Sequence, residues 1–144
     1  GPISEREQTS SGSRDTVAPG VIVTYVDRYI YVDGSMTTAT IFEMYFSWGD
    51  VGVQQIFSLL TGAVIAEVNV WMLEEFNGVN PVVTIGRDSD HGELMDVTEL
   101  DTRLLSSFST RPALEYSIGD AVNLYLSPGA GASAGRAVLS IYII

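Results

Sequence analysis

The chain has 144 residues, a length that suits one domain with a sizeable hydrophobic core. Hydrophobic residues make up 46% of it and charged residues 17%, and the absence of cysteine excludes a disulfide framework and thiolate chemistry. The formal net charge is −11, and all seven basic residues are arginines scattered singly, which argues against nucleic acid or a membrane as a partner.

The first twenty residues differ in composition from the rest. Residues 3–20 are polar, contain Ser and Gly, and show no apolar period, which is typical of a flexible arm. Such an arm either frays or becomes ordered on a partner or a neighbouring subunit. Gly1–Pro2 resembles a scar left by removal of an expression tag. We therefore expect a flexible N-terminal arm over residues 1–20 and a single domain over residues 21–144.

Strand patterns begin directly after the arm. Val21–Val32 is dense in β-branched and aromatic residues and is followed by the turn dipeptide Asp33–Gly34. Thr40–Trp48 shows the clearest alternation in the chain, with one face made of Phe42, Met44, Phe46 and Trp48. This period of two predicts a strand with one face toward the core.

The next two segments carry strand signals of different strength. Val53–Leu60 is compatible with either a helical turn or an irregular strand. Ala63–Met72 alternates by parity and predicts a long central strand. One row of this strand is wholly apolar: Val64, Ala66, Val68, Val70 and Met72. The other row is mixed: Ile65, Glu67, Asn69 and Trp71.

The remainder of the chain contains shorter strand signals. Asn77–Gly78 predicts a turn that would pair the short strand Pro81–Gly86 with the central strand. Arg87–Ser109 is irregular and acidic. Three further strands are predicted at Ala113–Ile118, Ala121–Ser127 and Arg136–Ile144. The whole profile predicts an all-β, antiparallel β-sandwich of jelly-roll type with seven to eight strands and no helix.

One acidic loop has the composition of a metal site. Asp88, Asp90 and Glu93 place carboxylates at short spacing beside Gly92, and calcium prefers such hard oxygen ligands on a tight turn. The spacing departs from the EF-hand pattern, so a plain solvated loop that turns at His91–Gly92 is the alternative. We expect no other cofactor.

Few residues suggest catalysis. The only histidine, His91, cannot complete a hydrolase triad by itself. Glu67, Glu74 and Glu75 could in principle hydrolyse a glycoside, but carboxylates along a strand usually form its solvated face, so we expect no enzyme. Six aromatic residues either pack in the core or line a sugar-binding or subunit-contact face: Tyr25, Tyr29, Tyr31, Tyr45, Trp71 and Tyr125.

The last ninety residues resemble a group of known proteins. An apolar strand leads to Phe76–Gly78 and then to the strand-glycine step Val82–Gly86. An Asp-rich loop, Asp88–Met95, comes next, and a Pro-Gly-Ala-rich hairpin, Pro128–Gly135, precedes the terminal strand. In this order of motifs the segment from Gln55 to Ile144 resembles the small β-sandwich structural proteins of tailed bacteriophages, the capsid decoration (cement) and fibre proteins.

This resemblance implies a non-enzymatic virion protein. It implies a capsid decoration protein, most commonly a homotrimer, that binds the major capsid protein or another virion protein and stabilises the head. The alternative is a fibre or tail domain, or a carbohydrate-binding module that recognises a glycan on the host surface. An extended polar arm suits attachment to a lattice, and an acidic body keeps the protein soluble before assembly.

Overall fold

The computed structural model describes the backbone of residues 23–32, 34–58, 62–112, 114–116 and 121–144, so the predicted arm lies outside the described residues. Within these ranges the chain forms ten strands and no helix, and none of the described residues belongs to a helix able to cross a membrane. The strands are β1 (Val23–Val32), β2 (Ser35–Ser47), β3 (Gly52–Ser58), β4 (Ala63–Glu74), β5 (Val82–Arg87), β6 (Asp90–Met95), β7 (Ser107–Thr110), β8 (Leu114–Tyr116), β9 (Ala121–Ser127) and β10 (Arg136–Ile143).

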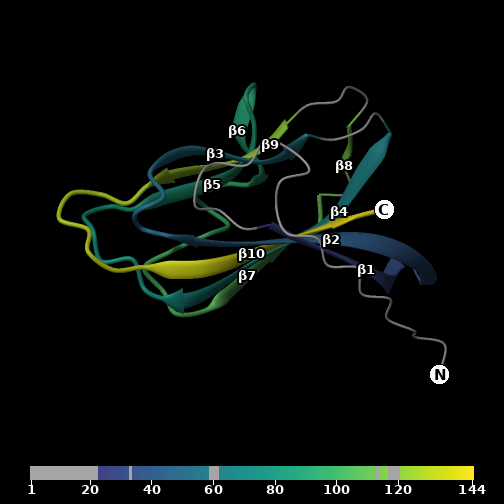
Figure 1. The fold of residues 1–144 in the computed structure, drawn as a ribbon, viewed down its shortest axis with the longest axis horizontal. Coiled ribbons are helices and arrows are strands. Elements are labelled where there is room, and N and C mark those ends of the chain that lie inside the picture. The colour runs from purple at the N-terminus through teal and green to yellow at the C-terminus, as the bar shows by residue number, and fades with distance from the viewer. Residues whose placement is uncertain (1–22, 33, 59–61, 113, 117–120) are drawn as a thin grey trace.

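The strands form two antiparallel sheets packed as a sandwich. The six-stranded sheet has the order β1-β2-β10-β4-β7, with β8 also paired to β4, and the four-stranded sheet has the order β3-β9-β5-β6. Figure 1 shows β3, β5, β6 and β9 of the four-stranded sheet above β2, β7 and β10 of the six-stranded sheet. The predicted fold class, an all-β antiparallel sandwich, is confirmed. The short strands β6 and β7 arise from the acidic segment that sequence alternation left unassigned.

The long strand predicted at Ala63–Met72 is β4, and it contains a β-bulge. Its register against β10 shifts between Tyr142 and Ile143, which leaves Ala66 as the extra residue. Val68, Val70 and Met72 of the wholly apolar row are buried in the core, but on the other side of the bulge Ile65 of the mixed row is buried in place of Val64. The inserted residue therefore changes which alternate positions of the strand face the core.

Residues 53–58 of the ambiguous segment Val53–Leu60 belong to strand β3, so the irregular-strand alternative is confirmed there, and residues 59 and 60 lie outside the described residues. Its register against β9 shifts between Gln55 and Phe57, which accounts for the broken alternation. Ile56, the residue at the shift, is buried in the core. The helical alternative rested only on this local break in the two-residue alternation.

The predicted pairing of Pro81–Gly86 with the central strand is wrong. Strand β5 pairs with β9 and β6 in the four-stranded sheet, whereas β4 pairs with β10, β7 and β8. Asn77–Gly78 therefore lies in a crossover between the two sheets and not in a hairpin. The side chain of Asn77 binds the 128–135 loop: its Oδ1 accepts from the N–H groups of Ser133 (2.9 Å) and Ala134 (3.1 Å).

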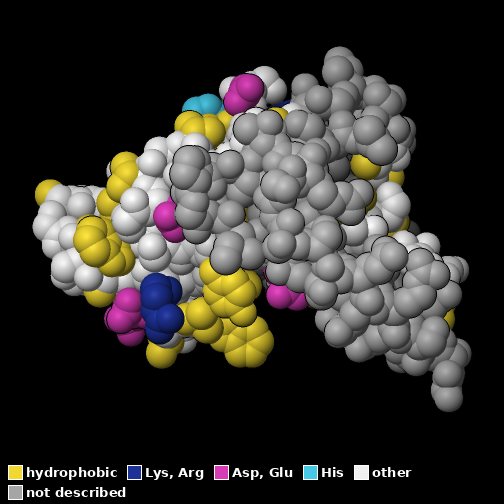
Figure 2. Space-filling view, in the orientation of Figure 1, with side chains coloured by type: hydrophobic (Ala, Val, Ile, Leu, Met, Phe, Trp, Pro, Cys, Tyr) yellow, Lys and Arg dark blue, Asp and Glu magenta, His cyan; other side chains and the backbone are white. Residues whose placement is uncertain are grey.

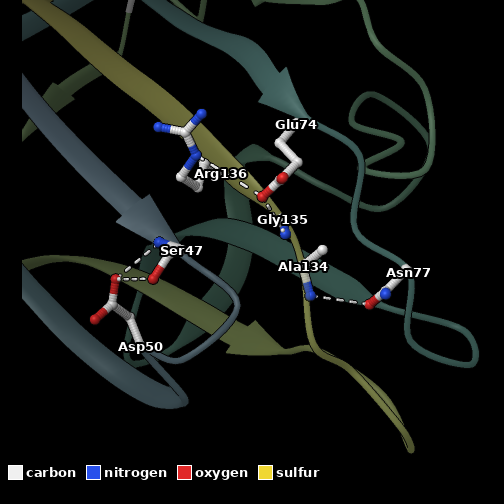
Figure 3. A network of polar contacts seen from close by, with 7 residues as sticks. All are labelled: Ser47, Asp50, Glu74, Asn77, Ala134, Gly135 and Arg136. Atoms are coloured by element: carbon white, nitrogen blue, oxygen red, sulfur yellow. Dashed lines mark hydrogen bonds and ion pairs between the residues drawn. The ribbon is translucent and has the colours of Figure 1, made fainter.

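Polar contacts join this crossover to the neighbouring strand ends (Figure 3). The N–H of Gly135 donates to Glu74 Oε1 (3.0 Å), and the N–H of Trp48 donates to the carbonyl of Gly135 (3.0 Å). Gly135 has a φ of 142°, and an added Cβ would lie within 2.5 Å of the Phe76 ring, so only glycine suits this position. The motifs Phe76–Gly78 and Pro128–Gly135, distant in sequence, thus form one end of the sandwich.

The core lies between the two sheets. Each sheet contributes alternating apolar side chains, such as Met44 and Leu139 from the six-stranded sheet and Ile85 and Leu124 from the four-stranded sheet, all completely buried. Phe76 adds a ring from the crossover, tilted against Phe46 with a centroid separation of 6.2 Å. The side chains that point the other way form the two outer faces, which hold the candidate sites.

Candidate functional site

The predicted calcium loop is a β-hairpin. Strands β5 and β6 are joined by a two-residue turn at Asp88–Ser89, so the chain reverses earlier than the expected turn at His91–Gly92. The hairpin curls tightly over Gly86, whose absent side chain leaves room for the carbonyl of Asp90. β6 is the edge strand of the four-stranded sheet, and its His91 reaches Tyr125 of β9.

The three predicted calcium ligands bind different partners in this structure. Asp88 Oδ1 accepts from Asn123 Nδ2 (3.0 Å), Asp90 Oδ1 accepts from the N–H of Gly92 (3.2 Å), and Glu93 Oε2 lies 2.7 Å from Arg87 Nη2. Among the described residues, no three His, Cys, Asp or Glu side chains are grouped so that they could hold a metal ion. Glu93 is paired with Arg87 in this structure, and the calcium site stays a prediction.

A polar cluster covers the middle of this hairpin. The side chain of His91 stacks on the ring of Tyr125, with centroids 3.8 Å apart and planes 8° from parallel. The Tyr125 hydroxyl accepts from Asn123 Nδ2 (3.0 Å) and donates to Asp88 Oδ1 (3.3 Å). Burial raises the pKa of Tyr125 above 10.0, and the nearby Asp88 carboxylate raises it further. The cluster fixes the hairpin against β9 with the phenol in its neutral form.

The acidic segment after the hairpin is held by local turns. Asp96 Oδ1 accepts from the hydroxyl (2.6 Å) and the N–H (2.9 Å) of Thr98, and these bonds lower the pKa of Asp96. The Asp101 carboxylate accepts two hydrogen bonds from the Arg103 guanidinium (2.9 and 3.0 Å), which lower the pKa of Asp101 and raise that of Arg103. These acids therefore shape a loop and are not gathered around a common point.

The carboxylates considered for glycoside hydrolysis lie along one strand and its end. Glu67 binds Arg111, with 3.0 Å between Oε1 and Nε, and Glu74 accepts from the N–H of Gly135. Seven residues of strand separate Glu67 from Glu74, about 20 Å, whereas glycosidase carboxylates lie about 5–10 Å apart. These two residues cannot flank one glycosidic bond.

The predicted aromatic residues divide between the faces. The side chains of Tyr25, Tyr29 and Tyr31 lie outside the described part. Tyr125 takes part in the polar cluster on the four-stranded sheet. Tyr45 and Trp71 lie on the outer face of the six-stranded sheet, where 62% and 63% of their surface is exposed.

Tyr45 and Trp71 belong to one row that crosses three strands. Tyr45 of β2 is opposite Val138 of β10, and Val138 is opposite Trp71 of β4. We call these three residues the aromatic row. Figure 2 shows hydrophobic side chains projecting at the lower edge of the molecule, on the side of the six-stranded sheet. Leu73 is the extra residue of a second bulge in β4. It is 41% exposed and adds a further apolar side chain beside Trp71.

Polar rows flank the aromatic row on both sides. On one side Glu43, Ser140, Asn69 and Ser109 pair across four strands, and on the other Ser47, Arg136 and Glu74 pair across three. The central amide of the first row is fixed: Asn69 Nδ2 donates to Glu67 Oε2 (2.9 Å), and Ser109 Oγ donates to Asn69 Oδ1 (2.6 Å). The outer face therefore combines an exposed apolar centre with ordered hydrogen-bonding borders.

Comparison with known proteins gives a match in fold. No known family model and no curated protein matches the sequence. The fold is similar to a chain in the acidic stable capsid structure of Helicobacter pylori bacteriophage KHP30, with a TM-score of 0.57 and 13% identity over 82% of this chain and 93% of that one. A chain of the cyanophage Pam1 capsid asymmetric unit has a TM-score of 0.49 and 13% identity over 96% of this chain and 91% of that one.

The sequence identifies Tyr45 and Trp71 as candidates but does not show that they lie in one row across the sheet. Val138, which completes the row, looks like any other β-branched strand residue, and only the strand order β2-β10-β4 brings the three together. The polar partners Asn69 and Ser109 are likewise 40 residues apart in sequence. The only indication in the sequence was the alternation of residues along β4, which correctly placed Glu67, Asn69 and Trp71 on one face.

Proposed function

We propose that this protein is a non-enzymatic structural component of a bacteriophage virion. The observation that carries this proposal is the shared fold with a phage capsid chain, whose length this chain covers almost completely. The order of motifs that resembles phage decoration and fibre proteins supports it independently of the fold match. Both point to a protein that acts by binding in the virion and not by catalysis.

Within the virion, the role we propose is that of a decoration (cement) protein that binds the major capsid protein as a homotrimer. A surface suited to such contacts lies at one end of the four-stranded sheet. Val51, Val53, Val79 and Val82 are 41–64% exposed there, and we call them the valine face. Burying exposed aliphatic side chains against a partner lowers the free energy of the complex. The acidic charge of the remaining chain opposes non-specific association.

The cement role is tested on capsids that lack this chain. Adding the purified protein to such capsids should raise the temperature at which the particles release their DNA. The variant Val53→Glu places a charge on the valine face and should abolish this gain, while Glu75→Gln, an exposed substitution elsewhere, should retain it. Capsids whose stability is unchanged by the wild-type protein would contradict the cement role.

The trimer is tested by light scattering coupled to size-exclusion chromatography. A mass of three times 15.6 kDa is expected for the wild type. A wild-type mass of 15.6 kDa at all protein concentrations would contradict a trimer in solution.

A second candidate function is a fibre or tail domain, or a carbohydrate-binding module, that recognises a glycan on the host surface. The exposure of Tyr45 and Trp71 on the outer face of the six-stranded sheet favours this candidate, because aromatic rings left in solvent on a rigid sheet suit stacking against sugars. This face is on the opposite side of the sandwich from the valine face, so one molecule could use both.

A further inference from the structure

We propose that the aromatic row Tyr45–Val138–Trp71 is a binding platform for a neutral, extended, β-1,4-linked oligosaccharide. This inference deepens the second candidate function by naming its site and ligand class, and it does not depend on the capsid role. The geometry, the exposed area and the charge of the face each restrict what can bind there.

The spacing of the two rings matches a sugar chain. Tyr45 and Trp71 are on strands that flank β10, so their backbones lie two strand spacings apart, about 10 Å. One pyranose in an extended β-1,4 chain spans about one strand spacing, and alternate sugars present the same face. Two sugars separated by a third would therefore stack on Tyr45 and Trp71, with the middle sugar over Val138.

The polar rows run parallel to this direction. The Glu43–Ser140–Asn69–Ser109 row lies two residues along the strands from the aromatic row, about 7 Å away. A sugar chain carries its hydroxyl groups around the edge of each ring, so the hydroxyls of a bound chain would meet this row. Because Glu67 and Ser109 already hold Asn69, little further ordering is needed on binding.

The two exposed rings by themselves offer much less area than a protein–protein interface buries. A fully covered Tyr or Trp buries about 150–250 Å², so the fractions exposed here leave on the order of 250 Å² for the two rings together. A standard protein interface needs roughly 800 Å² on each partner. The aromatic row suits a short oligosaccharide better than a second copy of this chain.

The charge of the face restricts the ligand to a neutral glycan. Among the described residues of this face, two arginines are accompanied by acids: Arg111 with Glu67 at 3.0 Å and Arg136 with Glu74 at 3.8 Å. Glu43 adds a further carboxylate, and the whole chain has a net charge of −11. An anionic polysaccharide would be repelled, while a neutral one can still accept and donate hydrogen bonds along both polar rows.

The test is isothermal titration of the full chain with four β-1,4-linked hexasaccharides, those of glucose, N-acetylglucosamine, mannose and xylose. At least one should bind, and the matching disaccharide should bind at least about tenfold more weakly because it cannot reach both rings. Trp71→Ala and Tyr45→Ala should each weaken binding about tenfold, whereas Trp71→Phe and Tyr45→Phe keep a ring and should retain most of it. Val97→Ala, at an exposed valine in the loop after β6, is the matched control and should change nothing.

Three results would overturn the proposal. The first is the absence of binding by all four hexasaccharides at millimolar concentration, and the second is binding that Trp71→Ala and Tyr45→Ala leave unchanged. The third is a loss of oligomer mass in light scattering for the same two variants, which would assign the face to a protein contact. Because both rings are exposed, these variants should fold, and circular dichroism checks this. Capsid binding is measured separately, so failure of the glycan site leaves the virion role standing.

Discussion

The crossover between the two sheets should depend on one side chain, that of Asn77. Its Oδ1 accepts from the N–H groups of Ser133 and Ala134, and its Nδ2 donates to Ser133 Oγ (2.9 Å). A net hydrogen bond contributes about 0.5–1.5 kcal/mol, and these bonds are exposed, so the lower part of that range applies to each. Asn77→Ala should therefore lower the free energy of unfolding by about 1.5 kcal/mol.

The matched variant is Asn77→Asp. Its carboxylate can still accept from both N–H groups, and the hydroxyl of Ser133 can rotate to donate to it. This variant should lose less than about 0.5 kcal/mol. Urea unfolding followed by tryptophan fluorescence at one protein concentration measures both changes, with the slope against urea unchanged. Equal destabilisation by Ala and Asp, or a loss below about 0.3 kcal/mol for Asn77→Ala, would refute the reasoning.

Three further predictions concern the ends of the sandwich. Gly135→Ala places a methyl group against the Phe76 ring at a positive φ and should destabilise the protein by about 2 kcal/mol, measured as a lower midpoint in urea; an unchanged midpoint would contradict this close approach. Because folding raises the pKa of Tyr125, the stability that the neutral phenol contributes is complete below pH 10 and is lost as the pH rises through the pKa of the folded state. Replacing the nearby carboxylate in Asp88→Asn should lower the pKa of Tyr125, measured by an absorbance titration of the phenolate. The calcium prediction requires that excess calcium raise Tm and that Asp90→Asn abolish the rise; an equal Tm with and without calcium would contradict it.

Alternation predicted the strands whose two faces differ strongly in polarity. β2, β10 and the part of β4 from Val68 to Met72 place apolar residues at every second position toward the core, so their period of two is visible without any partner. The strands β6 and β7 were missed because their sequences, DHGELM and SFST, are polar and short. They are strands because β5 and β4 offer them hydrogen-bonding edges, and this tertiary effect leaves no local pattern.

Bulges and long-range contacts account for the other differences. The extra residue Ala66 exchanges the faces of β4, and no local signal marks which residue will be inserted. Asn77–Gly78 has the composition of a hairpin turn, but the hydrogen bonds of Asn77 to residues 133 and 134 favour a crossover. The aromatic row could be predicted only as a set of candidate residues, because its alignment depends on the strand order.

The central claim is that this chain is a structural part of a phage particle. Quantitative mass spectrometry of purified virions from a phage whose genome carries this sequence tests this claim most directly. The account predicts that the chain remains with the particles through density-gradient purification, at a fixed copy number relative to the major capsid protein. Its absence from purified virions, with the chain present in the infected cell, would contradict the account.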